Sequence, residues 1–426
     1  MIITIAIHTF QESVRRKIPH VLIGLGILII VFSPFIPTTE EPDALPKIMM
    51  VVFFQVVVLV CNIGILLLAA TSIPREIESK TLYGILSKPI SKLKFVLGRI
   101  TGFSIVSALI LAVLALFHLA AIEWSASGLP EEYKGIVKAR EMFHASQFSI
   151  QGKPHHVHGE TIWIEGGKKG FASWNFSELY AHDENKNSFE IECNIKIESD
   201  REHFDDIPLI AKTENTLSGE FVTEVLSAKI DTPLTFKLNP AIIQKAGVVH
   251  IALSPESNSD FIGVTRENVK VFSVQQGFLL NYAKAIFITF LKFLLIVVVA
   301  VLGSSYLSTS VSVLYALVIF LCGHMVDFLR DFTLLIHGHD IHAHGLETAM
   351  KKPNTFLLFL DSILKKPLEW VSFLLPDFKK FDSLKFLLKG VSIPDDSIGA
   401  SVGYTALYAC VCIVIATIIL KNREFS

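Results

Sequence analysis

Two histidine clusters are the side chains of this sequence that come closest to metal-binding spacing. Imidazole nitrogens are common ligands of zinc and copper, and both clusters lie in polar stretches of the chain. Neither cluster matches the ligand spacing of a known metal-binding loop, and polar loops often carry histidine without a metal. We therefore predict no metal site and keep these clusters as the candidates for one. They are His155, His156, His158 and Glu160, and His337, His339, Asp340, His342 and His344.

No arrangement for covalent, acid–base or nucleotide chemistry stands out. The stretch "GGKKG" at 166–170 has neither the spacing of the phosphate-binding G-x-x-x-x-G-K-[ST] loop nor its strand-to-helix context. We predict that the chain is not an enzyme and holds no cofactor of its own. Trp163, Phe171, Trp174 and Phe176 would suit a sugar-stacking platform, but aromatic residues that alternate along strands more often form a core, and we favour the core.

The composition is that of a protein with several membrane spans. Of the 426 residues, 51% are hydrophobic and 32 are Phe, and the mean hydropathy is +0.52. The formal net charge of −2 indicates no nucleic-acid partner. The first apolar run follows Arg15, Arg16 and Lys17 and lacks a small-residue cleavage site, so it does not read as a cleaved signal.

Six apolar runs are predicted to cross the membrane. They follow an amphipathic segment at 1–18 that suits a helix lying on the membrane surface. An even number of spans places both termini on one side, and the basic ends identify that side as the cytoplasm of a multi-pass protein in the inner or plasma membrane. The predicted spans are 20–35, 48–73, 102–122, 278–302, 311–329 and 402–420.

The composition changes between residues 123 and 276, which we predict to form an extracytoplasmic all-β domain, a β-sandwich. It divides the α-helical membrane part into 1–122 and 277–426. A helix is predicted at 131–146, and the apolar side chains of 189–197 alternate as in one half-buried strand. Many short strands separated by turn residues are typical of a sandwich. Further strands are predicted near 161–164, 170–176, 207–212, 219–226, 233–238, 247–253 and 268–273.

The segment 330–400 is predicted to lie on the extracytoplasmic side, between the fifth and sixth spans. Its apolar pieces, 356–364 and 368–375, are too short to cross a bilayer and favour re-entrant or interfacial helices. The Lys and Arg residues of this segment oppose that placement, although long loops weigh less in the rule that relates charge to orientation.

The segment from Ile73 to Arg99, "IPREIESKTLYGILSKPISKLKFVLGR", is basic and separates two long apolar runs. A short loop with this much positive charge is expected on the cytoplasmic side. A short helix from Arg75 to about Leu86 and a stop at Lys88 and Pro89 give it the layout of a contact surface for a soluble partner.

This segment resembles the cytoplasmic signature of ABC-2 type ABC transporter permeases, of the kind with a large extracytoplasmic insertion between spans three and four. The family usually has Gly before the Thr and Arg after the Pro step, where this chain has Lys80 and Lys92. "FQESVRRK" resembles the family's N-terminal elbow helix. "LLPDFKKFD", with the later "YTALY" and "LKNREF", resembles the family's last span and tail. The resemblance implies that the matching residues couple the chain to an ATPase. They are Arg75, Glu76, Glu78, Thr81, Leu82, Leu86, Lys88, Pro89, Gly98 and Arg99.

The resemblance implies a function for the whole chain. In such permeases the segment that corresponds to 73–99 is a coupling helix that docks on a cytosolic ABC ATPase subunit. Since this chain has no phosphate-binding motif, ATP and Mg²⁺ are expected to bind to that partner. The implied partners also include a second copy or a paralogous permease, membrane lipids and an envelope accessory protein. Export is expected, and the transported substrate stays open.

Polar side chains within the predicted spans are candidates for a transport pathway. Lys292 lies inside the fourth span, and His324 and Asp327 lie near the outer end of the fifth. A charge at this depth suggests a lined pathway or an ion pair. We favour the alternative, a lysine that extends to the membrane surface or that marks a later start of the span. His118 is a further polar residue near an outer end.

Two other functions remain open at this point. The chain would act as a mechanical transmitter if ATP-driven motion reached an envelope partner through the β-domain without any transported cargo. It would act as a membrane-anchored binding module if no ATPase were attached.

Overall fold

The computed structural model describes the chain in two compact units. The helical unit comprises Met1–Ile136, Leu279–Lys389 and Ile393–Ser426, and the β unit comprises Val137–Phe278 and Gly390–Ser392. The β unit therefore begins later than the predicted 123–276. The described residues are 1–38, 43–79, 91–129, 136–137, 139–152, 156–158, 161–167, 170–177, 179, 189–200, 206–229, 234–243, 247–326 and 375–422.

Five helical stretches of the described residues are long and apolar enough to cross a membrane, as expected of a multi-pass membrane protein. The helix α10 (Thr309–His324) is apolar but shorter, and the end of the predicted fifth span, 327–329, lies outside the described residues. The five stretches are Ile18–Phe35, Ala44–Glu78, Lys92–Ser127, Phe278–Ser304 and Asp395–Asn422.

The chain turns sharply between its first two helices. Helix α1 (Ile2–Arg15) ends just before Lys17, which has a φ of 60°, a left-handed conformation that non-glycine residues seldom adopt. Helix α2 (Ile18–Phe32) then starts with Pro19 in its first turn, where a missing N–H is harmless. The amphipathic segment and the first apolar run are thus separate helices.

The second apolar stretch is not a uniform helix. It consists of α3 (Ala44–Val51), a π-helical turn at Val52–Val57, α4 (Val58–Ala70) and α5 (Ser72–Glu78). Such π turns often mark functional positions in membrane and soluble proteins alike. Here the turn carries side chains that line a cavity described below.

Helix α7 (Lys92–Ser127) is much longer than the predicted third span and begins at Ser91, whose side chain accepts a hydrogen bond from the Lys94 N–H (3.4 Å). Helix α1 packs closely against it. A Cβ at Gly98 would lie 2.7 Å from the Ile5 Cβ, and one at Gly102 would lie 2.8 Å from the Ala6 carbonyl oxygen. Only glycine permits this approach.

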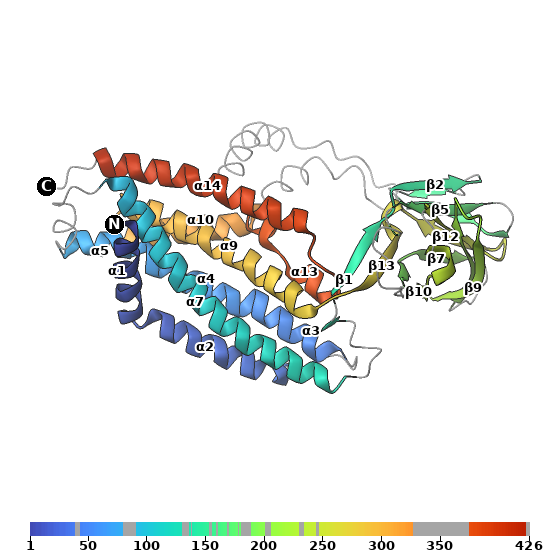
Figure 1. Ribbon diagram of the computed structural model, residues 1–426, viewed down its shortest axis with the longest axis horizontal. Helices are drawn as coiled ribbons and strands as arrows, with labels where there is room; N and C mark the ends of the chain where they lie inside the picture. Colours follow the sequence, from blue (N-terminus) through green and yellow to red (C-terminus); the bar gives the residue numbers. More distant parts are fainter. Residues whose placement is uncertain are drawn as a thin grey trace, which may run out of the picture. The chain divides into compact units, whose positions relative to one another are not determined.

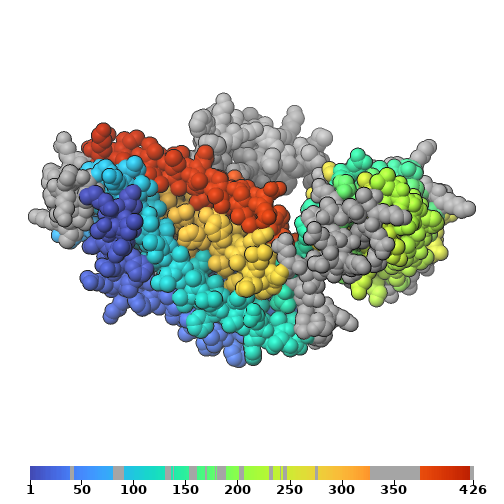
Figure 2. Space-filling view, in the orientation of Figure 1, coloured from blue at the N-terminus to red at the C-terminus, as the bar shows by residue number. Residues whose placement is uncertain are grey.

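The remaining helices complete the helical unit. Helix α9 (Phe278–Ser304) leads through a tight turn into α10, and α14 (Asp395–Asn422) ends the described chain. Figure 1 shows α1, α5 and the last residues of α14 at the same end of this unit. In Figure 2, α14 and α7 lie on the same face of it, and these two helices are in contact.

Part of the segment 330–400 packs into the helical unit. A 3-10 turn (Phe378–Phe381) and α13 (Leu384–Leu388) bury their apolar side chains. At Gly323 a Cβ would lie 2.5 Å from the Pro376 carbonyl oxygen, so this turn reaches the end of α10 closely. The predicted pieces 356–364 and 368–374 lie outside the described residues.

The β unit contains three antiparallel sheets in its described residues, with strand orders β1-β13-β6-β10, β2-β5-β11-β8-β9 and β3-β4-β12-β7. The further strands predicted between 161 and 273 are present, and α8 (Pro240–Ile243) is a single helical turn. The strands are β1 (Ala139–His144), β2 (Gln147–Gln151), β3 (His156–His158), β4 (Thr161–Glu165), β5 (Phe171–Phe176), β6 (Glu190–Cys193), β7 (Lys196–Ser199), β8 (Asp206–Asn215), β9 (Phe221–Lys229), β10 (Leu234–Lys237), β11 (Val249–Pro255), β12 (Asp260–Val264) and β13 (Val269–Gln276).

Two sequence predictions for this unit are wrong. The helix predicted at 131–146 is absent where the structure describes it, because 139–144 forms β1, which pairs with β13. The run 189–197 forms two strands in different sheets, since β6 pairs with β13 and β7 pairs with β12. A short, amphipathic sequence does not reveal which partner strand it will meet.

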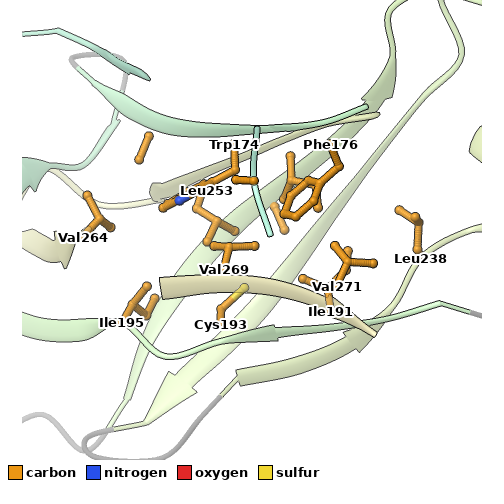
Figure 3. Packing of buried hydrophobic residues seen from close by; sticks show 14 of the residues in the cluster. Trp174, Phe176, Ile191, Cys193, Ile195, Leu238, Leu253, Val264, Val269 and Val271 are labelled. Carbon is orange, nitrogen blue, oxygen red and sulfur yellow. The ribbon is translucent and has the colours of Figure 1, made fainter. Parts of the chain in front are cut away.

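Trp174 lies at the centre of the β unit's core (Figure 3). Its side chain is fully buried, and its indole N–H donates to the carbonyl oxygens of Thr265 and Arg266, both at 3.2 Å. Phe176 is buried as well, so these two aromatic residues belong to the core, whereas Phe171 is half-buried. The core interpretation is confirmed for the buried pair.

We predict that Trp174→Ala destabilises the β unit by about 3–5 kcal/mol, because it opens a large cavity in a packed core. Phe221→Ala, which removes an exposed ring of similar kind, is expected to change the stability by less than about 0.5 kcal/mol. Pulse proteolysis of the full chain in urea, read as cleavage within the β unit, measures both. Equal effects of the two variants would show that Trp174 does not support the core.

Candidate functional site

A buried cluster of charged side chains lies at the ends of the predicted coupling segment. Arg99, near the start of α7, is only 1% exposed. Its guanidinium group is in ion-pair contact with Glu76 of α5, and it lies 3.3 Å from a carboxylate oxygen of Glu12 on α1. It also donates a hydrogen bond to the Ser72 hydroxyl (3.2 Å). Three helices distant in sequence therefore meet at one side chain.

A second arginine extends the cluster along α1. Arg16 pairs with Glu12 one turn away and donates a hydrogen bond to the Thr71 hydroxyl (3.3 Å), at the bend between α4 and α5. Burial raises the pKa of Glu12, but the guanidinium groups of Arg16 and Arg99 outweigh it and hold that pKa below its ordinary value. Glu12 is therefore a carboxylate at neutral pH.

Helix α10 is fastened to the same end of the helical unit. The Thr309 hydroxyl donates to a carboxylate oxygen of Glu78 (2.7 Å), and the Ser312 hydroxyl donates to the Ala70 carbonyl oxygen (2.9 Å). The first turn of α10 is thus bound to both sides of the bend at Thr71. A displacement of α5 is expected to move α10 with it.

We name this set the Arg99 cluster, and its energetics follow from burial. An arginine removed from water is tolerated only when carboxylates and hydroxyl groups compensate its charge, and removing one partner of such a buried pair is costly. The cluster therefore fixes the relative positions of α1, α5 and α7. Its members are Glu12, Arg16, Ser72, Glu76 and Arg99.

The structure brings together some of the predicted coupling residues and leaves others at the surface. Glu76 and Arg99 are in direct contact, and Gly98 packs against α1. Arg75 and Glu78 are exposed on α5. The remaining predicted residues lie outside the described residues and stay predictions: Thr81, Leu82, Leu86, Lys88 and Pro89.

Sequence reasoning missed Glu12, Arg16 and Ser72 as members of the cluster. Glu12 lies four residues before Arg16 on α1, a spacing typical of a helical ion pair, which is the one local signal for it. Its contact with Arg99 joins residues 87 apart in the chain, and no local pattern predicts such a pairing.

A second site is a cavity of 310 Å³ within the helical unit. Lys292 of α9 and His324 of α10, both predicted as pathway residues, line it together. The Phe378 ring contacts both side chains. The centroid of this ring lies 5.8 Å from the Lys292 Nζ and 4.8 Å from the centroid of the His324 ring. Asp327, the third predicted pathway residue, lies outside the described residues.

His118 has a structural role instead of lining this cavity. It is buried on α7, its Nδ1 lies 2.8 Å from the Tyr282 hydroxyl, and its Nε2 lies 3.2 Å from the Met49 carbonyl oxygen. Its ring stacks on Phe53 of the π turn at a centroid distance of 4.1 Å. It ties α7 to the second apolar stretch and to α9.

The histidine clusters fall mainly where the structure gives no description. His156 and His158 lie in β3, while His155, His337, His339, His342 and His344 lie outside the described residues. Among the described residues, no group of three or more His, Cys, Asp or Glu side chains is placed to hold a metal ion. Both metal candidates stay sequence predictions.

Comparison with known proteins identifies no family. No family model and no curated protein matches the chain. One similar solved structure is that of the CBM22-1 and GH10 modules of Clostridium thermocellum endo-1,4-beta-D-xylanase 10B with xylohexaose, at 10% identity, 32% coverage of this chain, 28% coverage of that chain and a TM-score of 0.20. Another is the CBM22-1 xylan-binding domain of Paenibacillus barcinonensis Xyn10C, at 8% identity, 33% and 92% coverage and a TM-score of 0.21. At these TM-scores neither neighbour assigns a fold or a ligand to this chain.

We predict that Arg99→Met lowers the free energy of unfolding of the helical unit by about 3–5 kcal/mol, because it leaves Glu76 buried without its main cation. Arg15→Met, a matched change on the exposed side of α1, is expected to cost less than about 0.5 kcal/mol. Unfolding of the purified full chain in mixed detergent micelles measures both. Equal losses would show that the cluster does not hold the helices together.

Proposed function

We propose that this chain is the membrane subunit of an ABC-2 type ABC transporter, which exports a substrate with energy from a separate cytosolic ATPase. In this proposal the chain crosses the membrane six times, with the predicted run 311–329 as the fifth span. Both termini lie in the cytoplasm, and the β unit is an extracytoplasmic β-sandwich. ATP and Mg²⁺ bind to the partner subunit.

The Arg99 cluster is the observation that carries the proposal. Residues 80–90 form the centre of the predicted coupling segment, and the cluster joins the two helices that flank them, α5 and α7, through Glu76 and Arg99. A segment whose two ends are fixed to each other transmits a push to both flanking helices instead of absorbing it. This is what docking on an ATPase requires of a permease.

The same contacts give the push a route into the membrane part. Glu12 and Arg16 connect the cluster to α1, and Glu78 connects α5 to α10. Helices α1, α5, α7 and α10 therefore respond together, as a two-state element that an ATPase biases from the cytosol.

The cavity lined by Lys292 and His324 favours transport over purely mechanical transmission. Charged groups within membrane spans are costly and are typical of substrate or ion pathways. A protein that only transmits force and moves no substrate does not require a cavity lined by a lysine within its membrane spans. We therefore place the pathway at this cavity and prefer export to the mechanical alternative.

The outer helices are suited to lipids and to a second permease subunit. Within the chain, α14 and α2 bury a small share of their apolar spans, and α14 exposes Leu407, Val411, Val414 and Ile418. Such faces are stable only against lipid or another apolar surface. A homodimer or a paralogous pair, surrounded by lipid, satisfies this requirement.

We predict that a Walker-type ATPase subunit co-purifies with the tagged chain from the membranes of its native cells. Arg75→Glu reverses an exposed charge on α5 and is expected to lower the recovered ATPase by about tenfold or more, because it places like charges across a docking surface. Arg75 is the appropriate position because Glu76 is buried in the cluster, so a charge reversal there would test folding.

The matched control is Arg15→Glu, an equally exposed arginine on α1 outside the coupling segment, which is expected to leave the recovery unchanged. The thermal midpoints of both variants show whether they fold. The proposal fails if the wild-type chain captures no ATPase, or if folded Arg75→Glu captures as much as the control.

A further inference from the structure

The cavity within the helical unit has a polar wall and a mouth at the outer surface of the helices. Thr289 and Lys292 of α9 and His324 of α10 form the wall. Gln55 and Leu59, from the π turn and α4, are exposed residues at its edge. An exposed glutamine in the middle of a membrane span is unusual, because lipid tails offer its amide no hydrogen bonds.

Positive charge predominates in the cavity. Lys292 forms no ion pair with any residue that the structure describes, although Lys284 on the same helix pairs with Asp395 at 2.8 Å. Lys379 also lines the cavity, and the single carboxylate among the lining residues, Asp382, is exposed and attracts Lys292 without forming an ion pair with it. A cationic hollow at membrane depth is matched in charge by an anionic group.

Apolar and aromatic surface surrounds the charged wall. Phe54, Phe378 and Phe381 contribute rings to the cavity. Val56 and Leu59 are exposed on the part of the second span that forms the edge of the cavity. A small inorganic anion would not be stabilised by this surface, because it has no apolar surface of its own to remove from water. A molecule with an anionic head and an acyl chain matches both parts.

We propose that this cavity binds the anionic head group of a membrane amphiphile, with Lys292 as the charged contact and with Thr289 and His324 lining the wall beside it. The amphiphile enters from the lipid side past Gln55, and its chain lies along the exposed apolar face beside Leu59. As a substrate site the cavity rests on the proposed transport function, whereas as a binding site it is independent of that function.

Native mass spectrometry of the purified full chain, titrated with phosphatidylglycerol or with phosphatidylcholine of the same acyl chains, tests the proposal. The wild-type chain is expected to bind one phosphatidylglycerol more tightly than phosphatidylcholine. Lys292→Gln is expected to weaken that first binding step by about tenfold, the effect of losing one charged hydrogen-bonding contact. Lys292→Arg, which keeps the charge, is expected to retain most of the affinity.

Lys284→Gln is the matched control, since it removes a lysine of the same helix that already has a carboxylate partner, and it is expected to leave the first binding step unchanged. Three outcomes would overturn the proposal: equal affinity of Lys292→Gln and the wild-type chain for phosphatidylglycerol, equal affinity of the wild-type chain for both lipids, or no lipid binding by the wild-type chain. Displacement of phosphatidylglycerol by millimolar inorganic phosphate would overturn the amphiphile part in favour of a free anion. Capture of the ATPase is a separate readout, so failure here leaves the proposed function standing.

Discussion

The structure of the helical unit depends on one buried guanidinium group. Arg99 is removed from water, and its charge is tolerable only while Glu76 and Glu12 remain in contact with it. Since these carboxylates belong to α5 and α1, the contacts restrict the positions of these two helices relative to α7. The close approach at Gly98 serves the same contact, because a side chain there would hold α1 away from α7. Electrostatic compensation therefore adds to the close packing of α1 on α7 in constraining the geometry at this end.

The helical unit treats its other interior cation differently. Lys292 has an aromatic neighbour in Phe378 and no carboxylate at ion-pair distance among the described residues. Arg99 has two carboxylates at ion-pair distance, whereas Lys292, beside the cavity, has none among the described residues and feels the attraction of the exposed Asp382. The contrast supports a division of labour, in which the Arg99 cluster transmits force and the cavity receives a ligand.

Sequence reasoning found the apolar spans and most β strands, because both depend on local periodicity. It named Glu76 and Arg99 as coupling residues through a motif and Lys292 as a pathway candidate through its depth in a span, and these roles stay predictions. It could not find the pairing of Glu12 with Arg99, which is a long-range contact. It also missed β12 (Asp260–Val264), a strand buried on both faces that shows no alternation. The π turn in the second span, whose Phe53 stacks on His118, leaves no mark in composition.

We propose that the Arg99 cluster lies at the cytoplasmic end of the spans and that the β unit lies on the extracytoplasmic side. Labelling of intact cells with a membrane-impermeant maleimide tests it, with Cys322 and Cys410 replaced by Ala. We expect Leu217→Cys, at an exposed position of the β unit, to be labelled at once. We expect Lys94→Cys, exposed at the start of α7, to react only after the membrane is permeabilised. Labelling of Lys94→Cys in intact cells would contradict the account.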